Sequence, residues 1–79
     1  MSERTELRWR CRRGMKELDI LLLRYLEHCY GQASRQEREA FSQLLDLQDP
    51  ELLAFLMGRA TPEDKVMADV AASISIYRS

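Results

Sequence analysis

The chain has 79 residues, of which 46% are hydrophobic and 32% are charged. A chain of this length forms one domain with one small core, and its composition is typical of a globular protein and not of a disordered or membrane protein. The formal net charge is −1, but residues 1–16 carry six basic and two acidic side chains, a local balance of +4 that leaves −5 for the remainder. A basic end of this kind suits an anionic ligand or an acidic partner surface.

The first expected element is a short polar helix over residues 3–13. Its residues mostly favour helices, and Leu7 and Cys11 are four positions apart, which gives a narrow apolar stripe. Trp9 lies off this stripe, so it either packs along the edge of the bundle, which we favour, or is partly exposed for binding. Gly14 follows the helix, and glycine commonly ends helices.

A long central helix is predicted from residue 15 to residue 30. Apolar residues recur there at intervals of three and four, as a buried helix face requires. Gly31 is expected to end this helix. The positions expected on the buried face are Met15, Leu18, Leu22, Tyr25, Leu26 and Cys29.

A third helix should begin at Arg35. Ser34 and Glu37 are three residues apart, which is the spacing of a capping box. The helix should end near residue 47, and its core side is expected to consist of Ala40, Phe41, Leu44 and Leu45.

Two further helices have an aspartate or threonine followed by proline as their start signal. Asp49-Pro50 predicts an N-cap for a fourth helix that ends before Gly58, and Thr61-Pro62 predicts the start of a fifth helix that continues to about residue 77. The inner face of this last helix should consist of Val66, Met67, Val70, Ala71 and Ile74. Together the patterns predict an all-α fold, a small five-helix antiparallel bundle that forms a single domain over residues 1–79.

The bend at Gly14 is the most distinctive feature of the sequence. We expect Arg13 in the last turn of the first helix and Glu17 in the first turn of the second, so that both project at one exposed corner. Each would also be stabilised there by the dipole of its own helix, and glycine is the residue that a left-handed cap favours. Helix capping and a binding function therefore explain these three residues equally well.

The string Arg13-Gly14-x-x-Glu17, with Trp9 before it and Leu18-Asp19 after it, resembles the RGxxE signature of the SdhE family. Members of this family are the bacterial relatives of succinate dehydrogenase assembly factor 2, and they promote covalent attachment of FAD to the flavoprotein subunit. The similarity continues through Glu27-His28, the segment with Phe41, Leu44 and Leu45, and Asp49-Pro50 with Leu52 and Leu53.

The resemblance implies that the corner docks on the flavoprotein subunit of succinate dehydrogenase, with that of fumarate reductase as a second candidate. Arg13 would donate to a carboxylate or a carbonyl of the partner, Gly14 would let two backbones approach, and Glu17 would accept from a cation or an amide. Four further residues would extend this partner-binding surface: Trp9, Arg10, Lys16 and Asp19. FAD would be the partner's cofactor, with none bound stably by this chain, which we expect to be a monomer.

Groups that could carry catalysis are few. His28 is the only histidine, and its neighbour Glu27 points elsewhere because adjacent residues diverge on a helix. Cys11 and Cys29 are far apart, without a CxxC motif or a histidine pair that would complete a metal site. We therefore predict a protein that is not an enzyme and that has no metal site.

Targeting signals are also not expected. The first 13 residues are charged throughout, and the longest apolar run, Ile20–Leu23, is too short to span a bilayer. A bacterial cytoplasmic location is the default. The main alternative function is a small helical nucleic-acid-binding or antitoxin-like regulatory module that uses the basic first helix, with affinity that falls steeply with salt. The acidic remainder of the chain argues against it, and we expect no nucleic acid partner.

Overall fold

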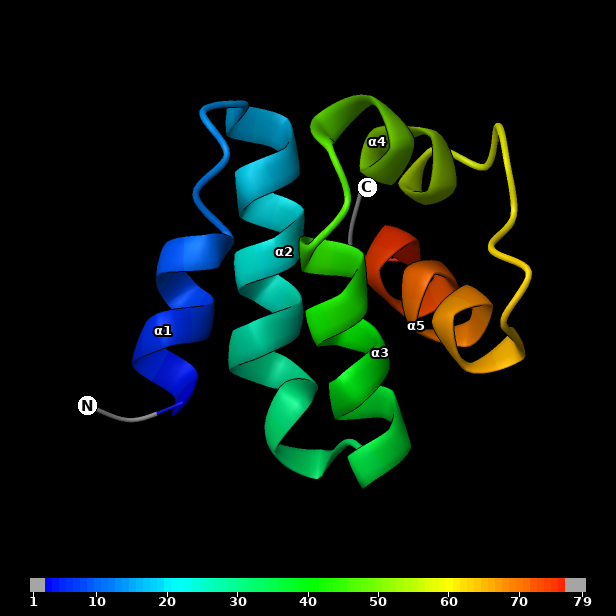
Figure 1. The fold of residues 1–79 in the computed structure, drawn as a ribbon. Helices are drawn as coiled ribbons and strands as arrows, with labels where there is room; N and C mark the ends of the chain where they lie inside the picture. Colours follow the sequence, from blue (N-terminus) through cyan, green and yellow to red (C-terminus); the bar gives the residue numbers. More distant parts are fainter. Residues whose placement is uncertain (1–2, 77–79) are drawn as a thin grey trace.

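The computed structural model describes residues 3–76, and this part of the chain is helical without strands. Its elements are α1 (Glu3–Arg10), α2 (Lys16–His28), the 3-10 helix η1 (Tyr30–Gln32), α3 (Arg35–Leu45), α4 (Asp49–Leu56) and α5 (Lys65–Ile76). The predicted all-α fold is confirmed. In Figure 1, α1, α2 and α3 run alongside one another, while α5 packs against α2, α3 and α4 and closes the core from the other side.

The first helix is shorter than predicted, and Arg13 lies outside it. The α-helical hydrogen-bond pattern stops after Arg10. The Arg12 amide donates to the Trp9 carbonyl at 3.1 Å, three residues before it, whereas an α-helix would use the carbonyl four residues before. The Arg13 amide then donates to Oδ1 of Asp19 in α2, at 2.8 Å, so it no longer extends the helix. Arg13 therefore belongs to the linker between α1 and α2, and its expected place in the last helical turn was wrong.

The predicted role of Gly31 was also wrong. The central helix ends at His28, and the chain continues as η1 without a left-handed residue, since Gly31 is not among the glycines of positive φ. The Arg38 side chain donates to the carbonyls of Tyr30 and Gly31 at 3.2 and 3.0 Å. At the end of α2 itself, the Leu26 carbonyl accepts from the Arg4 side chain at 3.1 Å and the Tyr25 carbonyl accepts from the Cys29 amide at 2.8 Å, so these carbonyls have partners without a glycine cap.

The capping box at the start of α3 is confirmed. The Ser34 hydroxyl accepts from the Glu37 amide at 3.1 Å, and Glu37 Oε1 accepts from the Ser34 amide at 2.8 Å. These hydrogen bonds hold the pKa of the Glu37 carboxyl below its usual value. The helix that this box starts ends at Leu45, two residues earlier than predicted.

The last two helices begin at other residues than predicted. Gln48 is the N-cap of α4, and Asp49 is already helical. The Asp49 carboxylate does not cap the helix but accepts from Arg13. The fifth helix begins at Lys65 and not after Thr61-Pro62, since Asp64 Oδ2 accepts from the Met67 amide at 2.9 Å and serves as the cap. Gly58 has a φ of +78° directly after α4, as the predicted helix end requires.

The core is formed by the inner faces that the periodicity predicted. Tyr25 of α2 and Phe41 of α3 stack at 4.8 Å between ring centroids and join these two helices. Two expectations were wrong: Trp9 does not pack against the core but is 68% exposed, and Met15 is 38% exposed. The fully buried side chains include Cys11, Leu18, Leu22, Leu26, Phe41, Leu44, Leu52, Leu56, Val70 and Ile74.

Cys11 is completely enclosed, and burial raises the pKa of its thiol from 9.0 to about 11. In the unfolded chain the thiol ionises near its ordinary value. The stability that this group contributes is therefore present below pH 9 and lost as the pH rises towards 11. We expect Cys11 to account for a loss on the order of 2 kcal/mol in the free energy of unfolding across this window.

Urea unfolding at several pH values between 8 and 11 would measure this loss. Cys11→Ala is the comparison, because it removes the ionising group while Tyr25, whose pKa burial raises to about 12, is retained. The wild type should lose stability more steeply than the variant. Equal slopes for the two proteins would contradict the assignment.

Candidate functional site

The linker between α1 and α2, residues 11–15, together with the first turn of α2, forms a corner of the molecule. Gly14 has a φ of +85°, which L side chains rarely adopt, and its left-handed conformation was predicted correctly. A Cβ placed on Gly14 would meet no other atom within 4 Å. The glycine is therefore required here by the backbone conformation, and the space beside it is open.

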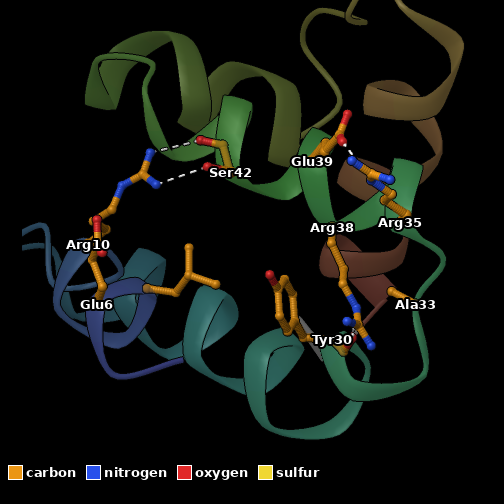
Figure 2. A pocket seen from close by; sticks show the side chains of 9 residues that line it. Glu6, Arg10, Tyr30, Ala33, Arg35, Arg38, Glu39 and Ser42 are labelled. Atoms are coloured by element: carbon orange, nitrogen blue, oxygen red, sulfur yellow. Dashed lines mark hydrogen bonds and ion pairs between the residues drawn. The ribbon is translucent and has the colours of Figure 1, made fainter. Parts of the chain in front are cut away.

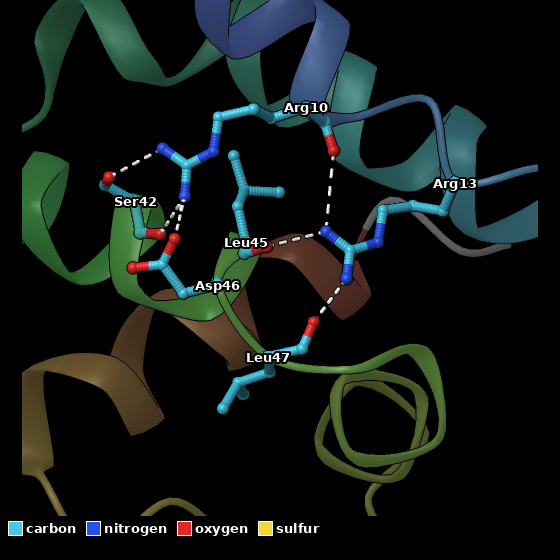
Figure 3. A network of polar contacts seen from close by, with 6 residues as sticks. All are labelled: Arg10, Arg13, Ser42, Leu45, Asp46 and Leu47. Carbon is cyan, nitrogen blue, oxygen red and sulfur yellow. Dashed lines mark hydrogen bonds and ion pairs between the residues drawn. The ribbon is translucent and has the colours of Figure 1, made fainter.

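Arg13 does not project from this corner but turns into the molecule. Its side chain is 13% exposed, and Nε donates to Asp49 Oδ1 at 2.6 Å. Nη1 donates to the Leu45 carbonyl at 2.7 Å and Nη2 to the Leu47 carbonyl (Figure 3). The guanidinium N–H groups that we expected to donate to a partner donate to acceptors of this chain instead. The prediction that Arg13 projects from the corner was therefore wrong.

Arg10, three residues before Arg13, also donates to acceptors near the end of α3. Nη1 donates to the Ser42 hydroxyl and Nη2 to the Ser42 carbonyl, both at 2.9 Å, and Nη2 also pairs with the Asp46 carboxylate (Figure 3). The carbonyls at the end of a helix lack partners within the helix and carry partial negative charge. Arg10 and Arg13 therefore act together as a cap on the C-terminal end of α3.

Of the four remaining predicted residues, Asp19 is engaged within the chain, whereas Lys16, Glu17 and Trp9 are exposed. Asp19 is half-buried and holds the Arg13 amide. Lys16 and Glu17 are exposed in the first turn of α2, and neither side chain forms a hydrogen bond or ion pair within residues 3–76. Of the Arg13-Gly14-x-x-Glu17 string, Glu17 and the open side of Gly14 are thus the parts available to a partner.

Three large hydrophobic side chains are exposed in the described part of the chain, and all belong to residues 9–20. They are Trp9 at 68%, Met15 at 38% and Ile20 at 39%. The Arg12 guanidinium carbon lies 5.4 Å from the Trp9 ring centroid, within reach of a cation–π interaction. Arg12, Met15 and Ile20 were not among the residues predicted for this surface. The signal for Ile20 was its position beside the main apolar stripe of α2.

The basic N-terminal segment is partly neutralised within the fold. Arg8 pairs with Glu27 at 3.5 Å, and Arg10 and Arg13 pair with aspartates. Three of the six cations of residues 1–16 therefore already have a carboxylate partner. Nucleic acid binding depends on cations that can neutralise phosphates, so this pairing disfavours the alternative function.

A groove of about 650 Å³ lies between α1, η1 and α3. Figure 2 shows Arg10, Arg35 and Arg38 around it, but each of them already has acceptors. Arg35 pairs with Glu39 at 3.4 Å, and Arg38 donates to backbone carbonyls and lies over the Tyr30 ring. The groove therefore offers no uncommitted cation to a ligand.

Residues 3–76 contain no cluster of three side chains suited to hold a metal ion. His28 is exposed at the end of α2, Cys11 is enclosed in the core, and Cys29 is half-buried. Within the same residues, none of the helices has the length and apolar character needed to cross a membrane.

A family model described as "Flavinator of succinate dehydrogenase" matches residues 5–78, almost the whole chain. The chain belongs to this family. Three similar proteins carry the name FAD assembly factor SdhE. That of Methylococcus capsulatus is 50% identical over 74 residues, which cover 94% of this chain and 89% of its own. That of Xylella fastidiosa strain Temecula1 is 49% identical over 78 residues, covering 99% and 77%. That of Coxiella burnetii is 45% identical over 69 residues, covering 87% and 84%.

Membership in this family confirms the resemblance that the RGxxE string indicated. It also confirms the prediction that the chain is not an enzyme, because the family consists of assembly factors.

Proposed function

We propose that this chain promotes covalent attachment of FAD to the flavoprotein subunit of succinate dehydrogenase, and that it binds this subunit through the corner at Gly14. The observation that carries the proposal is the exposed Glu17 carboxylate, without a partner in the described structure, beside the open face of Gly14. Family membership supplies the reaction class.

The contacts follow from the chemistry of the corner. Glu17 accepts from a cation or an amide of the flavoprotein, and Gly14 lets the partner backbone approach. Trp9 is the aromatic anchor, since large aromatic side chains contribute strongly at protein interfaces, and Lys16 adds a charge at the edge. Arg10, Arg13 and Asp19 belong to the same site through their contacts within the chain.

The chain supplies no reacting group in this proposal. In the partners of the SdhE family a histidine of the flavoprotein joins the 8α position of the flavin, a reaction that the flavoprotein largely performs on itself. A binding protein accelerates such a step by selecting the arrangement in which the two reacting groups are aligned, because alignment lowers the entropic part of the barrier.

We also propose where and when the chain acts. The chain acts in the cytoplasm as a monomer, binds the immature subunit and leaves before the enzyme complex is completed. It holds no stably bound cofactor of its own, and FAD belongs to its partner. The flavoprotein of fumarate reductase is the second candidate partner.

Binding to the two forms of the flavoprotein tests this function. A protein shifts a conformational equilibrium only by its difference in affinity for the two states. We therefore expect purified chain to bind the apo flavoprotein subunit at least about tenfold more tightly than the flavinylated subunit. Isothermal titration calorimetry measures both Kd values, with Glu17→Ala as the variant that should bind neither form well. Equal affinity for both forms would sink the transient assembly role.

A further inference from the structure

Arg13 is fixed from two directions at once. Its amide donates to Asp19 in α2, and its guanidinium reaches the segment that joins α3 to α4, where it contacts Leu45, Leu47 and Asp49. Gly14 is the next residue, and its positive φ sets the path of the chain into the first turn of α2. The position of the corner is thus coupled to a segment more than thirty residues away in sequence.

The guanidinium of Arg13 already donates to acceptors within the chain and has few N–H groups left for a partner. Nε, Nη1 and Nη2 each donate to an acceptor of this chain, and the side chain is 13% exposed. A flavoprotein could engage this guanidinium only by breaking bonds that cap the end of α3. Glu17, in contrast, is exposed and has no acceptor or donor to give up within the described residues.

We infer that Arg13 is a positioning residue, which pairs with Asp49 to hold Gly14 and Glu17 in the binding arrangement and does not itself touch the flavoprotein. This inference rests on the proposed function. It assigns a role in partner binding to Asp49, a residue of the first turn of α4 that the sequence indicated only as a helix cap.

The pair acts by lowering the cost of ordering the corner. Side chains and loops that must be immobilised on binding reduce affinity, and a surface held in its bound arrangement avoids this loss. When the Asp49 charge is removed, Arg13 keeps its carbonyl acceptors but loses its ion pair with the carboxylate. The linker should then move more, although Glu17 itself is unchanged.

The test uses Arg13→Gln, Asp49→Asn and the double variant in the full chain, with affinity for the apo flavoprotein subunit of succinate dehydrogenase as the readout. Arg35→Gln and Asp69→Asn are the matched controls, since they remove an exposed arginine with an ion pair and an exposed aspartate. We expect each single variant to raise Kd at least about tenfold. The Kd of the double variant should be no more than about twofold above that of the single variant with the lower affinity, because Arg13 and Asp49 act as one unit.

A second readout needs no partner. Amide hydrogen exchange of Arg13 and Asp19, whose amides donate to the Asp19 carboxylate and to the Met15 carbonyl, should accelerate in the free chain of both single variants and stay unchanged in both controls. Asp49→Asn retains the carbonyl contacts of Arg13, so it keeps the test decisive if Arg13→Gln fails to fold.

The outcomes separate the two claims. If the wild-type chain binds the flavoprotein and Asp49→Asn binds equally well, the positioning role is overturned while the proposed function stands. Additive losses in the double variant would likewise overturn it, because they indicate that Arg13 contacts the partner directly. If the wild-type chain does not bind the flavoprotein at all, the proposed function fails, and the positioning role fails with it.

Discussion

Replacement of Arg13 by alanine is expected to lower the free energy of unfolding by about 2–4 kcal/mol. The substitution removes a largely buried guanidinium and leaves the carbonyls of Leu45 and Leu47 without their donor, together with an Asp49 carboxylate that loses its cation. In a domain of this size 1 kcal/mol corresponds to about 4–8 °C in Tm, so thermal unfolding followed by circular dichroism should show a fall of at least about 10 °C.

The matched control for this experiment is Arg35→Ala. Arg35 also pairs with a carboxylate, but its side chain is 92% exposed, and exposed pairs contribute little. Its Tm should stay within about 3 °C of the wild type. An Arg13→Ala protein that melts together with this control would show that the guanidinium is not held at the end of α3.

Replacement of Glu17 by alanine should separate function from stability. Glu17 lies in the first turn of α2, where a carboxylate gains no more than about 1 kcal/mol from the helix dipole. Its side chain forms no hydrogen bond or ion pair within residues 3–76. The fold should therefore persist. Affinity for the apo flavoprotein should fall at least about tenfold, since Glu17 is the exposed carboxylate that the partner is proposed to engage.

Glu51→Ala is the control for Glu17→Ala. Glu51 is an exposed glutamate in the first turn of α4, so its removal costs the same helix-dipole contact without touching the corner. Calorimetric titration of both variants against the apo flavoprotein measures the difference. Equal affinities for the two variants would show that the corner carboxylate has no special role in binding.

The local features of the fold could be predicted because each depends on residues that are close in sequence. Helical periodicity identified the buried faces, the Ser34 and Glu37 pair identified the start of α3, and Gly14 identified the left-handed turn. These signals act within one or two turns of a helix.

The features that were missed depend on residues far apart in sequence. Arg13 was expected to point outwards because nothing nearby in sequence accepts its donors; its acceptors belong to residues 45–49. Asp49 looked like an N-cap for the same reason, and at the end of α2 the Leu26 carbonyl accepts from Arg4, which is 22 residues away in sequence. Trp9 was ambiguous because a side chain beside the apolar stripe is either covered or exposed, depending on neighbours that local periodicity does not specify.

The central claim is that the corner at Gly14 serves flavin attachment. Its most direct test is in-gel flavin fluorescence of the succinate dehydrogenase flavoprotein in cells that lack this chain, complemented with wild type, Glu17→Ala or Glu51→Ala. The account predicts that wild type and Glu51→Ala restore the covalent flavin signal and that a folded Glu17→Ala does not. Full flavin attachment in cells without the chain, or equal restoration by all three proteins, would contradict it.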